Sequence, residues 1–125
     1  MEPFWRRAAR TKATDAGIRA VSEDDGGECR LLLSGRITID SSPDLRSLLL
    51  QRIQSPDCRS LTADFYDVVY IDTSGVATLV EILKSARASG KVFRLTRLRE
   101  RPHYLLEVTR LLHLFEGVNS PEGPQ

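Results

Sequence analysis

Sequence features that metal-binding or redox functions require are scarce in this chain. Its 125 residues include two cysteines, Cys29 and Cys58, and two histidines, His103 and His113. None of the four stands in a spacing typical of a zinc site or a redox motif. We therefore expect no metal and no cofactor, and we interpret both cysteines as reduced residues that pack in the interior.

Long apolar segments are also missing. No stretch approaches the roughly 20 apolar residues that a membrane-spanning helix needs. The pair Arg6-Arg7 lacks the apolar run that follows the basic start of an export signal. The expected location of the protein is the cytoplasm.

Motifs of nucleophilic or phosphate-binding enzymes are absent as well. The chain has no glycine-rich phosphate loop, and Ser74 lacks the Gly-x-Ser-x-Gly setting of a hydrolase nucleophile. No histidine stands near Ser74 in the sequence to activate it. Asp64, Asp67 and Asp72 are candidate cation ligands, but acidic residues beside strand ends are common without a cation. We expect no catalytic residues and no enzymatic activity.

Size and composition are those of one globular domain. The chain is 41% hydrophobic and 28% charged, with a formal net charge of +1. Basic residues are nevertheless concentrated in residues 1–12, which hold four of them against one acidic residue. With Phe4 and Trp5 nearby, this segment is either a membrane or partner contact or, in the simpler interpretation that we favour, a short mobile extension.

A second basic cluster, defined by Arg94, Arg97, Arg99 and Arg101, lies near the end of the domain. Few aromatic residues are interleaved with it and the net charge is small, so direct nucleic-acid binding is not expected. A solvated face is the simplest interpretation. The alternative is a docking face, because arginine suits carboxylate or phosphate recognition.

Hydrophobic periodicity predicts an α/β fold in which helices pack against a mixed β-sheet. Strands are expected at 17–21, 30–37, 61–65, 68–71 and 92–96, with the first of them at the sheet edge. Helices are expected to begin at Ser42, at Ser74 and near Pro102. We divide the chain into a basic N-terminal extension (1–16), one domain (17–116) and a flexible C-terminal tail (117–125).

The junction Asp72-Thr73-Ser74-Gly75 is the strongest candidate site. It follows an apolar strand and opens an amphipathic helix. Unpaired backbone N–H groups and the helix dipole favour an anion at such a helix start, including a phosphate on Ser74. The competing interpretation is that one of these polar side chains does no more than cap the helix.

The run Tyr70-Ile71-Asp72-Thr73-Ser74-Gly75-Val76 resembles the signature of the STAS family, named for sulfate transporters and anti-sigma factor antagonists. The similarity extends from about Cys29 to Phe115, and it includes Leu33-Ser34-Gly35-Arg36-Ile37 and Leu105-Leu106-Glu107-Val108. The resemblance implies a single STAS-like domain over 17–116. It also implies a function like that of single-domain anti-sigma factor antagonists, which act by binding a protein.

In these antagonists the serine that aligns with Ser74 is phosphorylated by an anti-sigma factor with serine kinase activity, and the unmodified form binds that partner. The resemblance therefore implies that Ser74 is the phosphoacceptor, with Thr73 as a secondary candidate. It implies four partner-binding residues: Asp72, Thr73, Gly75 and Val76.

One position departs from the pattern of the antagonists. Many of them carry an acidic residue where this chain has Thr38, and Asp40 follows two positions later. The alternative function is a STAS accessory subunit of a membrane lipid-transport ATPase, in which the same helix start docks on a transporter without phosphorylation. Thr38 and the basic, aromatic-containing N-terminus favour this alternative.

Overall fold

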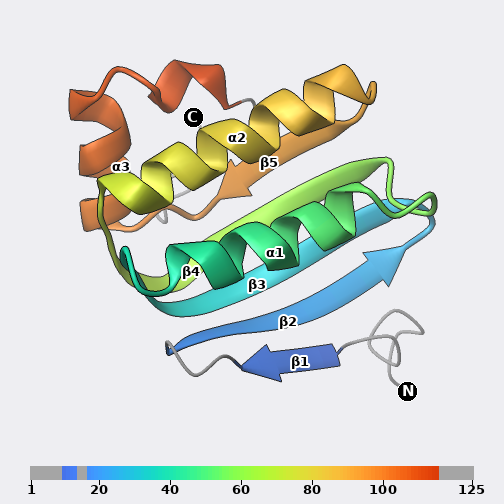
Figure 1. The fold of residues 1–125 in the computed structure, drawn as a ribbon, viewed down its shortest axis with the longest axis horizontal. Coiled ribbons are helices and arrows are strands. Elements are labelled where there is room, and N and C mark those ends of the chain that lie inside the picture. The colour runs from blue at the N-terminus through green and yellow to red at the C-terminus, as the bar shows by residue number, and fades with distance from the viewer. Residues whose placement is uncertain (1–9, 14–16, 116–125) are drawn as a thin grey trace.

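A five-stranded mixed β-sheet carries the fold, as the computed structural model shows for residues 10–13 and 17–115 (Figure 1). The strand order is β1-β2-β3-β4-β5, with antiparallel pairing from β1 to β3 and parallel pairing from β3 to β5. The strands are β1 (Arg10–Ala13), β2 (Ile18–Asp25), β3 (Glu28–Ile37), β4 (Ser60–Ile71) and β5 (Val92–Thr96). The predicted α/β class with a mixed sheet is confirmed.

Three α-helices connect and follow the strands. Helix α1 joins β3 to β4, α2 joins β4 to β5, and α3 follows β5. Their bounds are α1 (Ser42–Ile53), α2 (Thr73–Ala88) and α3 (Glu100–Val108), with a short 3-10 helix at Leu112–Leu114. The sequence predicts that the last helix begins near Pro102, and α3 begins two residues earlier, at Glu100.

The sheet extends one strand further than the sequence predicts. Residues 17–21 were expected at the edge, but β1 pairs with β2 through the register Arg10↔Ser22 to Ala13↔Arg19. Four residues of the predicted N-terminal extension thus form the edge strand. The remainder of that extension (1–9 and 14–16) and the predicted tail (117–125) lie outside the described residues.

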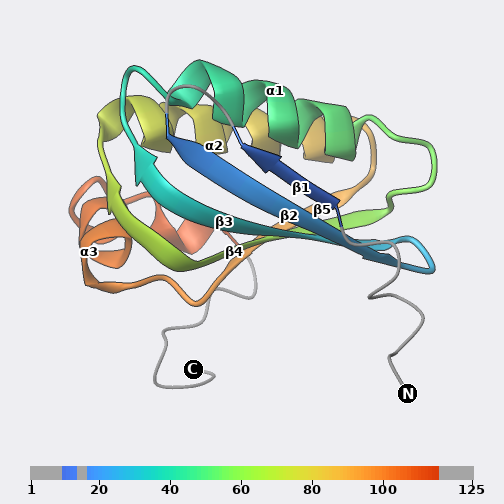
Figure 2. The same cartoon turned by 90° about the horizontal axis from the view of Figure 1, so that it is seen from below.

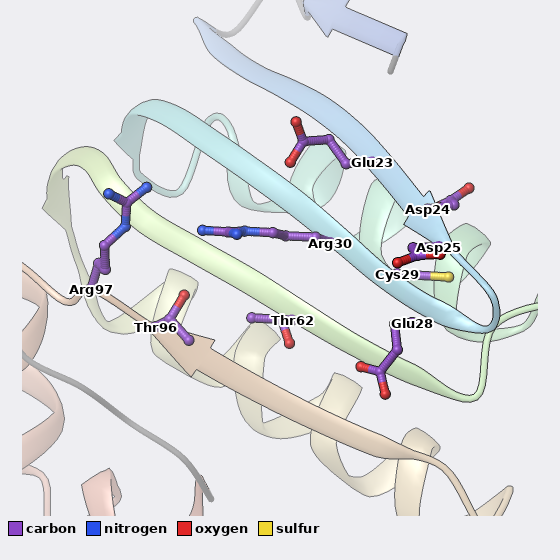
Figure 3. A pocket seen from close by; sticks show the side chains of 9 residues that line it. All are labelled: Glu23, Asp24, Asp25, Glu28, Cys29, Arg30, Thr62, Thr96 and Arg97. Atoms are coloured by element: carbon purple, nitrogen blue, oxygen red, sulfur yellow. The ribbon is translucent and has the colours of Figure 1, made fainter. Parts of the chain in front are cut away.

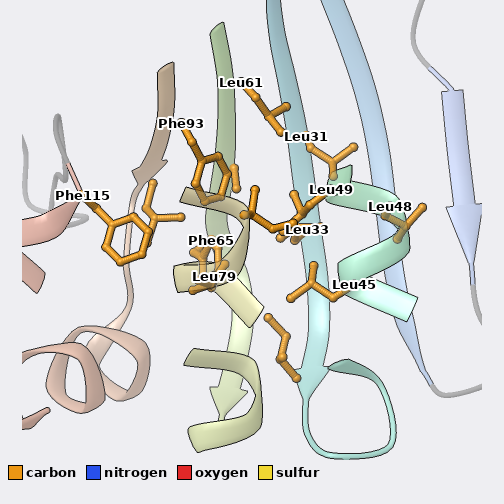
Figure 4. Close-up of a cluster of buried hydrophobic side chains, with 14 of the residues drawn as sticks. Leu31, Leu33, Leu45, Leu48, Leu49, Leu61, Phe65, Leu79, Phe93 and Phe115 are labelled. Carbon is orange, nitrogen blue, oxygen red and sulfur yellow. The ribbon is translucent and has the colours of Figure 1, made fainter. Parts of the chain in front are cut away.

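The hydrophobic core lies between the sheet and helices α1 and α2, which cover the same face (Figure 2). Apolar side chains from both layers are fully buried there (Figure 4). The largest of these side chains include Leu31, Leu33, Leu45, Leu49, Leu61, Phe65, Leu79 and Phe93. Their burial is the main term that favours this arrangement of layers.

Strand β4 is continuous where the sequence suggests two separate runs. Its pairing with β3 shifts by one residue between Leu32 and Ser34, and again between Gly35 and Arg36. Such irregularities insert an extra residue and change which way the following side chains point. Consequently Arg36 pairs with Tyr70, and Ile37 pairs with the buried Ile71 at the end of both strands.

Parallel pairing brings the carboxyl ends of β3 and β4 to one edge of the sheet. The segment after β3 leads into α1, and the segment after β4 leads directly into α2. Helix α3 lies at the same end (Figure 1). Residues that are more than thirty positions apart therefore meet where the two strands finish.

The face of the sheet opposite α1 and α2 holds a buried carboxylate, Asp64, which is 1% exposed. Arg97 and Arg30 each approach its Oδ2 to 2.6 Å, and the backbone N–H of Tyr66 donates to its Oδ1. Burial alone raises the pKa of Asp64, but these hydrogen bonds outweigh it and hold the pKa below its ordinary value. The ion pairs link β3, β4 and the segment that follows β5.

We predict that Asp64→Asn lowers the free energy of unfolding at neutral pH by about 1–3 kcal/mol, because charge-assisted hydrogen bonds are lost. Since the native pKa of Asp64 is lowered, its contribution is present above the unfolded-state pKa and disappears as pH falls through the native pKa. The difference from the natural protein should therefore shrink in acid. Urea unfolding measured between about pH 7 and pH 3 tests this.

Asp67→Asn is the matched control for this measurement, because Asp67 lies on the same strand with an exposed side chain. It should change the free energy of unfolding by about 0.5 kcal/mol or less. A difference between the natural protein and Asp64→Asn that stays constant with pH would contradict the assigned role of the carboxylate.

Candidate functional site

Helix α2 begins at a side-chain cap formed by Asp72. The residue is extended, with φ −111° and ψ −175°, and its Oδ1 accepts hydrogen bonds from the backbone N–H of Ser74 (3.0 Å) and Gly75 (3.3 Å). Aspartate is among the residues that favour this position, because the first N–H groups of a helix lack partners inside it. The capping role that the sequence allowed is therefore present.

Asp72 also joins the helix start to the loop after β3. Its Oδ2 accepts a hydrogen bond from the backbone N–H of Ile39 (3.1 Å), and its own N–H donates to the carbonyl of Ile37 (3.0 Å). Although burial raises the pKa of Asp72, the hydrogen bonds from Ser74, Gly75 and Ile39 lower it overall. The ionised carboxylate thus holds two chain segments together.

The hydroxyl of Ser74 belongs to this network. Its Oγ donates to Asp72 Oδ1 over 2.5 Å, and the side chain is half-buried. The carbonyl of Ser74 accepts a hydrogen bond from Thr78 Oγ1 (3.1 Å). The predicted phosphoacceptor is therefore held by an ionised carboxylate, at the positive end of α2.

The four predicted partner-binding residues differ in accessibility. Thr73 is exposed and Asp72 is half-buried, whereas Gly75 and Val76 are buried. A Cβ at Gly75 would lie 2.5 Å from Ile37 Cγ2 and 2.6 Å from Ile71 Cγ1. The absence of a side chain at Gly75 thus allows the helix start to rest directly on the ends of β3 and β4.

Ile39 is an exposed apolar residue beside this junction that the sequence analysis missed. It is 72% exposed, the highest value among the large apolar side chains of the described residues. Ile39 comes two residues after the buried Ile37, so in a continuing strand it would point to the same, buried side. Strand β3 ends at Ile37, and Ile39 is therefore exposed. The hydrogen bond from Ile39 to Asp72 spans 33 residues, and no local signal predicts it.

The segment between β3 and α1 is a tight turn. The backbone N–H groups of Ser41 and Ser42 donate to the carbonyl of Thr38, and the Ser41 hydroxyl donates to the carbonyl of Arg36. Strand β3 ends at Ile37, so Asp40 lies in the turn rather than on the strand. Its carboxylate is exposed just before the start of α1. Because Asp40 is not on the strand, the alternation of side chains along β3 does not determine which way the carboxylate points.

The second basic cluster is divided by the fold. Arg94 donates to Ser60 Oγ, and Arg97 is bound to Asp64. Arg99 donates to the carbonyl of Tyr66 and lies 4.9 Å from the centre of its ring. Arg101 is the one member of this cluster that lies over Tyr70, at 5.1 Å from the centre of the ring. Neighbouring arginines in the sequence therefore have different surroundings.

A hollow of about 490 Å³ lies on the sheet face that carries Asp64 (Figure 3). Arg30 and Arg97 form one side of it, and their side chains point toward one another. Acidic residues of β2 and β3 form the other side, while Thr62 and Thr96 line its floor. The arginines there are already bound to Asp64, so the hollow is a less distinctive site than the start of α2.

The cysteines, possible metal ligands and possible membrane-spanning helices were also considered in the sequence, and the structure describes each of them. Cys29 and Cys58 are buried and form no disulfide, and burial together with the neighbouring Cys58 raises the pKa of Cys29 to about 12. Within residues 10–13 and 17–115, no group of three or more His, Cys, Asp or Glu side chains is arranged to hold a metal ion. No helix in the described part of the chain is long and apolar enough to span a bilayer.

The sequence of this domain matches a known protein family. Residues 21–116 match the family described as "Mlab, STAS domain". The chain belongs to this STAS family.

Solved structures share the fold at low sequence identity. An anti-sigma factor antagonist from Mycobacterium paratuberculosis is 20% identical with a TM-score of 0.71, over 88% of this chain and 91% of that one. The phosphorylated form of SpoIIAA, a Bacillus cell fate determinant, is 11% identical with a TM-score of 0.60, over 90% of each chain. A sulfate transporter family protein from Wolinella succinogenes is 20% identical with a TM-score of 0.62, over 74% of this chain and 76% of that one.

We predict that Gly75→Ala lowers the free energy of unfolding by about 1–2 kcal/mol. The new methyl group would overlap branched carbon atoms of Ile37 and Ile71, and this cost exceeds the gain of about 1 kcal/mol that alanine brings to a helix. Urea unfolding provides the measurement. Thr73→Ala, an exposed change to the same residue type two positions away, should alter stability by about 0.5 kcal/mol or less. Equal effects of the two changes would exclude the packing role of Gly75.

Proposed function

We propose that this protein is an anti-sigma factor antagonist that acts by binding a protein partner and is switched by phosphorylation of Ser74. The observation that supports the proposal most directly is the hydrogen bond from Ser74 Oγ to Asp72 Oδ1. That carboxylate also caps α2 and binds the loop at Ile39, so a change at the hydroxyl reaches both of these chain segments.

A phosphate on Ser74 would change this network in a defined way. Modification removes the donor hydrogen of Ser74 Oγ and adds about −1.5 to −2 charges beside the ionised Asp72. The N–H groups of Ser74 and Gly75, which would otherwise attract a phosphate, are already bound to Asp72. Repulsion between the two anions would loosen the cap and the contact to Ile39.

The proposed partner is an anti-sigma factor with serine kinase activity, which binds the unmodified junction. Thr73 and Asp72 provide the accessible polar contacts, and the exposed Ile39 provides an apolar one. Gly75 and Val76 contribute by fixing the helix start on the sheet, because both are buried. The structural neighbours support this assignment through their fold: the M. paratuberculosis protein is described as an anti-sigma factor antagonist, and SpoIIAA is known in a phosphorylated form.

The test is phosphorylation by a cognate serine-kinase anti-sigma factor with ATP, followed by mass spectrometry. We expect one phosphate on Ser74, no modification of Ser74→Ala and unchanged modification of the control Ser89→Ala, which removes an exposed hydroxyl at the other end of α2. Because repulsion and desolvation oppose docking, Ser74→Asp should bind the kinase about tenfold more weakly, a difference of about 1.4 kcal/mol. Phosphate on another residue, or unchanged binding of Ser74→Asp, would refute the switch.

A second candidate function is an accessory subunit of a membrane lipid-transport ATPase. The hydroxyl of Ser74 is half-buried and already bonded, which suits a structural role at a docking surface without modification. The structural neighbour from a sulfate transporter family is consistent with a STAS domain in a transport setting. Here α2 would dock on the transporter through Thr73 and its neighbours.

Purification of the tagged protein with its transporter ATPase distinguishes this candidate. It predicts a stable complex that Ser74→Ala leaves intact, whereas Thr73→Arg, which adds a bulky charge at the exposed first residue of α2, disrupts it. Failure to recover an ATPase subunit with the natural protein would reject it.

A further inference from the structure

Two arginines from distant parts of the chain share one tyrosine ring near the start of α2. The guanidinium carbon of Arg36, at the end of β3, lies 4.4 Å from the centre of the Tyr70 ring, and that of Arg101, on α3, lies 5.1 Å from it. Both arginine side chains are exposed. Contact with the electron-rich ring favours these positions of the two cations.

These two cations differ from the other arginines on this side of the sheet. Arg30 and Arg97 are neutralised by the buried Asp64. In residues 10–13 and 17–115, by contrast, neither Arg36 nor Arg101 forms an ion pair with a carboxylate. Two neighbouring guanidinium groups repel each other, and an anion that contacts both removes this repulsion while forming charge-assisted hydrogen bonds.

The position of the pair connects it to the proposed docking surface. Tyr70 is two residues before Asp72, and Arg36 immediately precedes Ile37, whose carbonyl accepts the Asp72 N–H. The cations therefore lie at the same edge of the sheet as Ser74. A protein partner that covers the α2 start and reaches past the ends of β3 and β4 to the opposite face of the sheet, where α3 lies (Figure 2), would meet them.

We propose that Arg36 and Arg101, arranged on Tyr70, bind an acidic segment of the protein partner that docks at the α2 N-terminus. The proposal rests on the proposed function for the identity of this partner. A carboxylate-rich segment fits because guanidinium groups pair with carboxylates in a planar, two-point geometry. The small net charge and the acidic side chains of β2 and β3 disfavour the broad basic surface that nucleic acids or anionic membranes need.

The test uses the full chain, unmodified and without ATP, and a synthetic peptide of alternating Asp and Glu residues. Titration followed by NMR should shift the Nε–H signals of Arg36 and Arg101 and the ring signals of Tyr70. Arg36→Gln and Arg101→Gln should each weaken binding about threefold, and the double variant about tenfold. Added salt should weaken binding further.

Arg59→Gln is the matched control. Arg59 is exposed at the opposite end of β4, where it donates to the carbonyl of Gly26, and its loss removes the same charge. It should leave the peptide affinity unchanged. Arg101→Lys keeps the charge but loses the planar two-point geometry, so it should recover only part of the affinity.

Four outcomes would overturn the proposal: no binding of the peptide, equal binding by the double variant, signal changes confined to residues 1–12, or preferential binding of single-stranded DNA or phosphatidylserine vesicles at the same arginines. Unfolding curves of each variant establish that the fold is retained. Because neither a kinase nor Ser74 modification takes part, failure here leaves the phosphorylation result standing, and the reverse also holds.

Discussion

The carboxylate of Asp72 is the point on which this end of the molecule depends. One of its oxygens satisfies the first N–H groups of α2 and the Ser74 hydroxyl, while the other binds the backbone of Ile39. Parallel pairing of β3 and β4 makes both contacts possible, since it places the ends of the two strands together. A single ionised group therefore couples the helix, its hydroxyl and a loop that is distant in the sequence.

The residues around Asp72 differ in burial: Gly75 packs against the sheet, whereas Thr73 and Ile39 are exposed. Gly75 allows the helix to rest on Ile37 and Ile71, which leaves no space for the helix start to move inward. Under the proposed switch, a change at Ser74 would act on the exposed Thr73 and Ile39 rather than on the core. The arginines on Tyr70 add positive charge at the same edge. A partner that contacts both the α2 start and these arginines would bind differently when Ser74 is modified, while its contacts to the arginines stay the same.

The sequence was sufficient for features that depend on local pattern. Hydrophobic periodicity located β3 and β5, and the polar junction between an apolar strand and an amphipathic helix indicated the start of α2 to within one residue. It could not reveal β1, which is four residues long and polar, or the second role of Asp72, which depends on a contact 33 residues away. It also could not separate Arg101 from Arg97, because their partners Tyr70 and Asp64 are determined by the register of β4.

That register has a consequence for how the family's sequences can vary in length. Strand β4 spans twelve residues beside the ten of β3, and the two extra residues are accommodated at separate irregularities. Side chains alternate between faces along a regular strand, so one residue lost or gained there would reverse the facing of everything that follows. One residue lost or gained at either irregularity is absorbed locally, because two residues of one strand face a single residue of the other at that point. Relatives that keep both the Arg36–Tyr70 pairing and the buried Ile71 should therefore differ in the length of this strand at those two points.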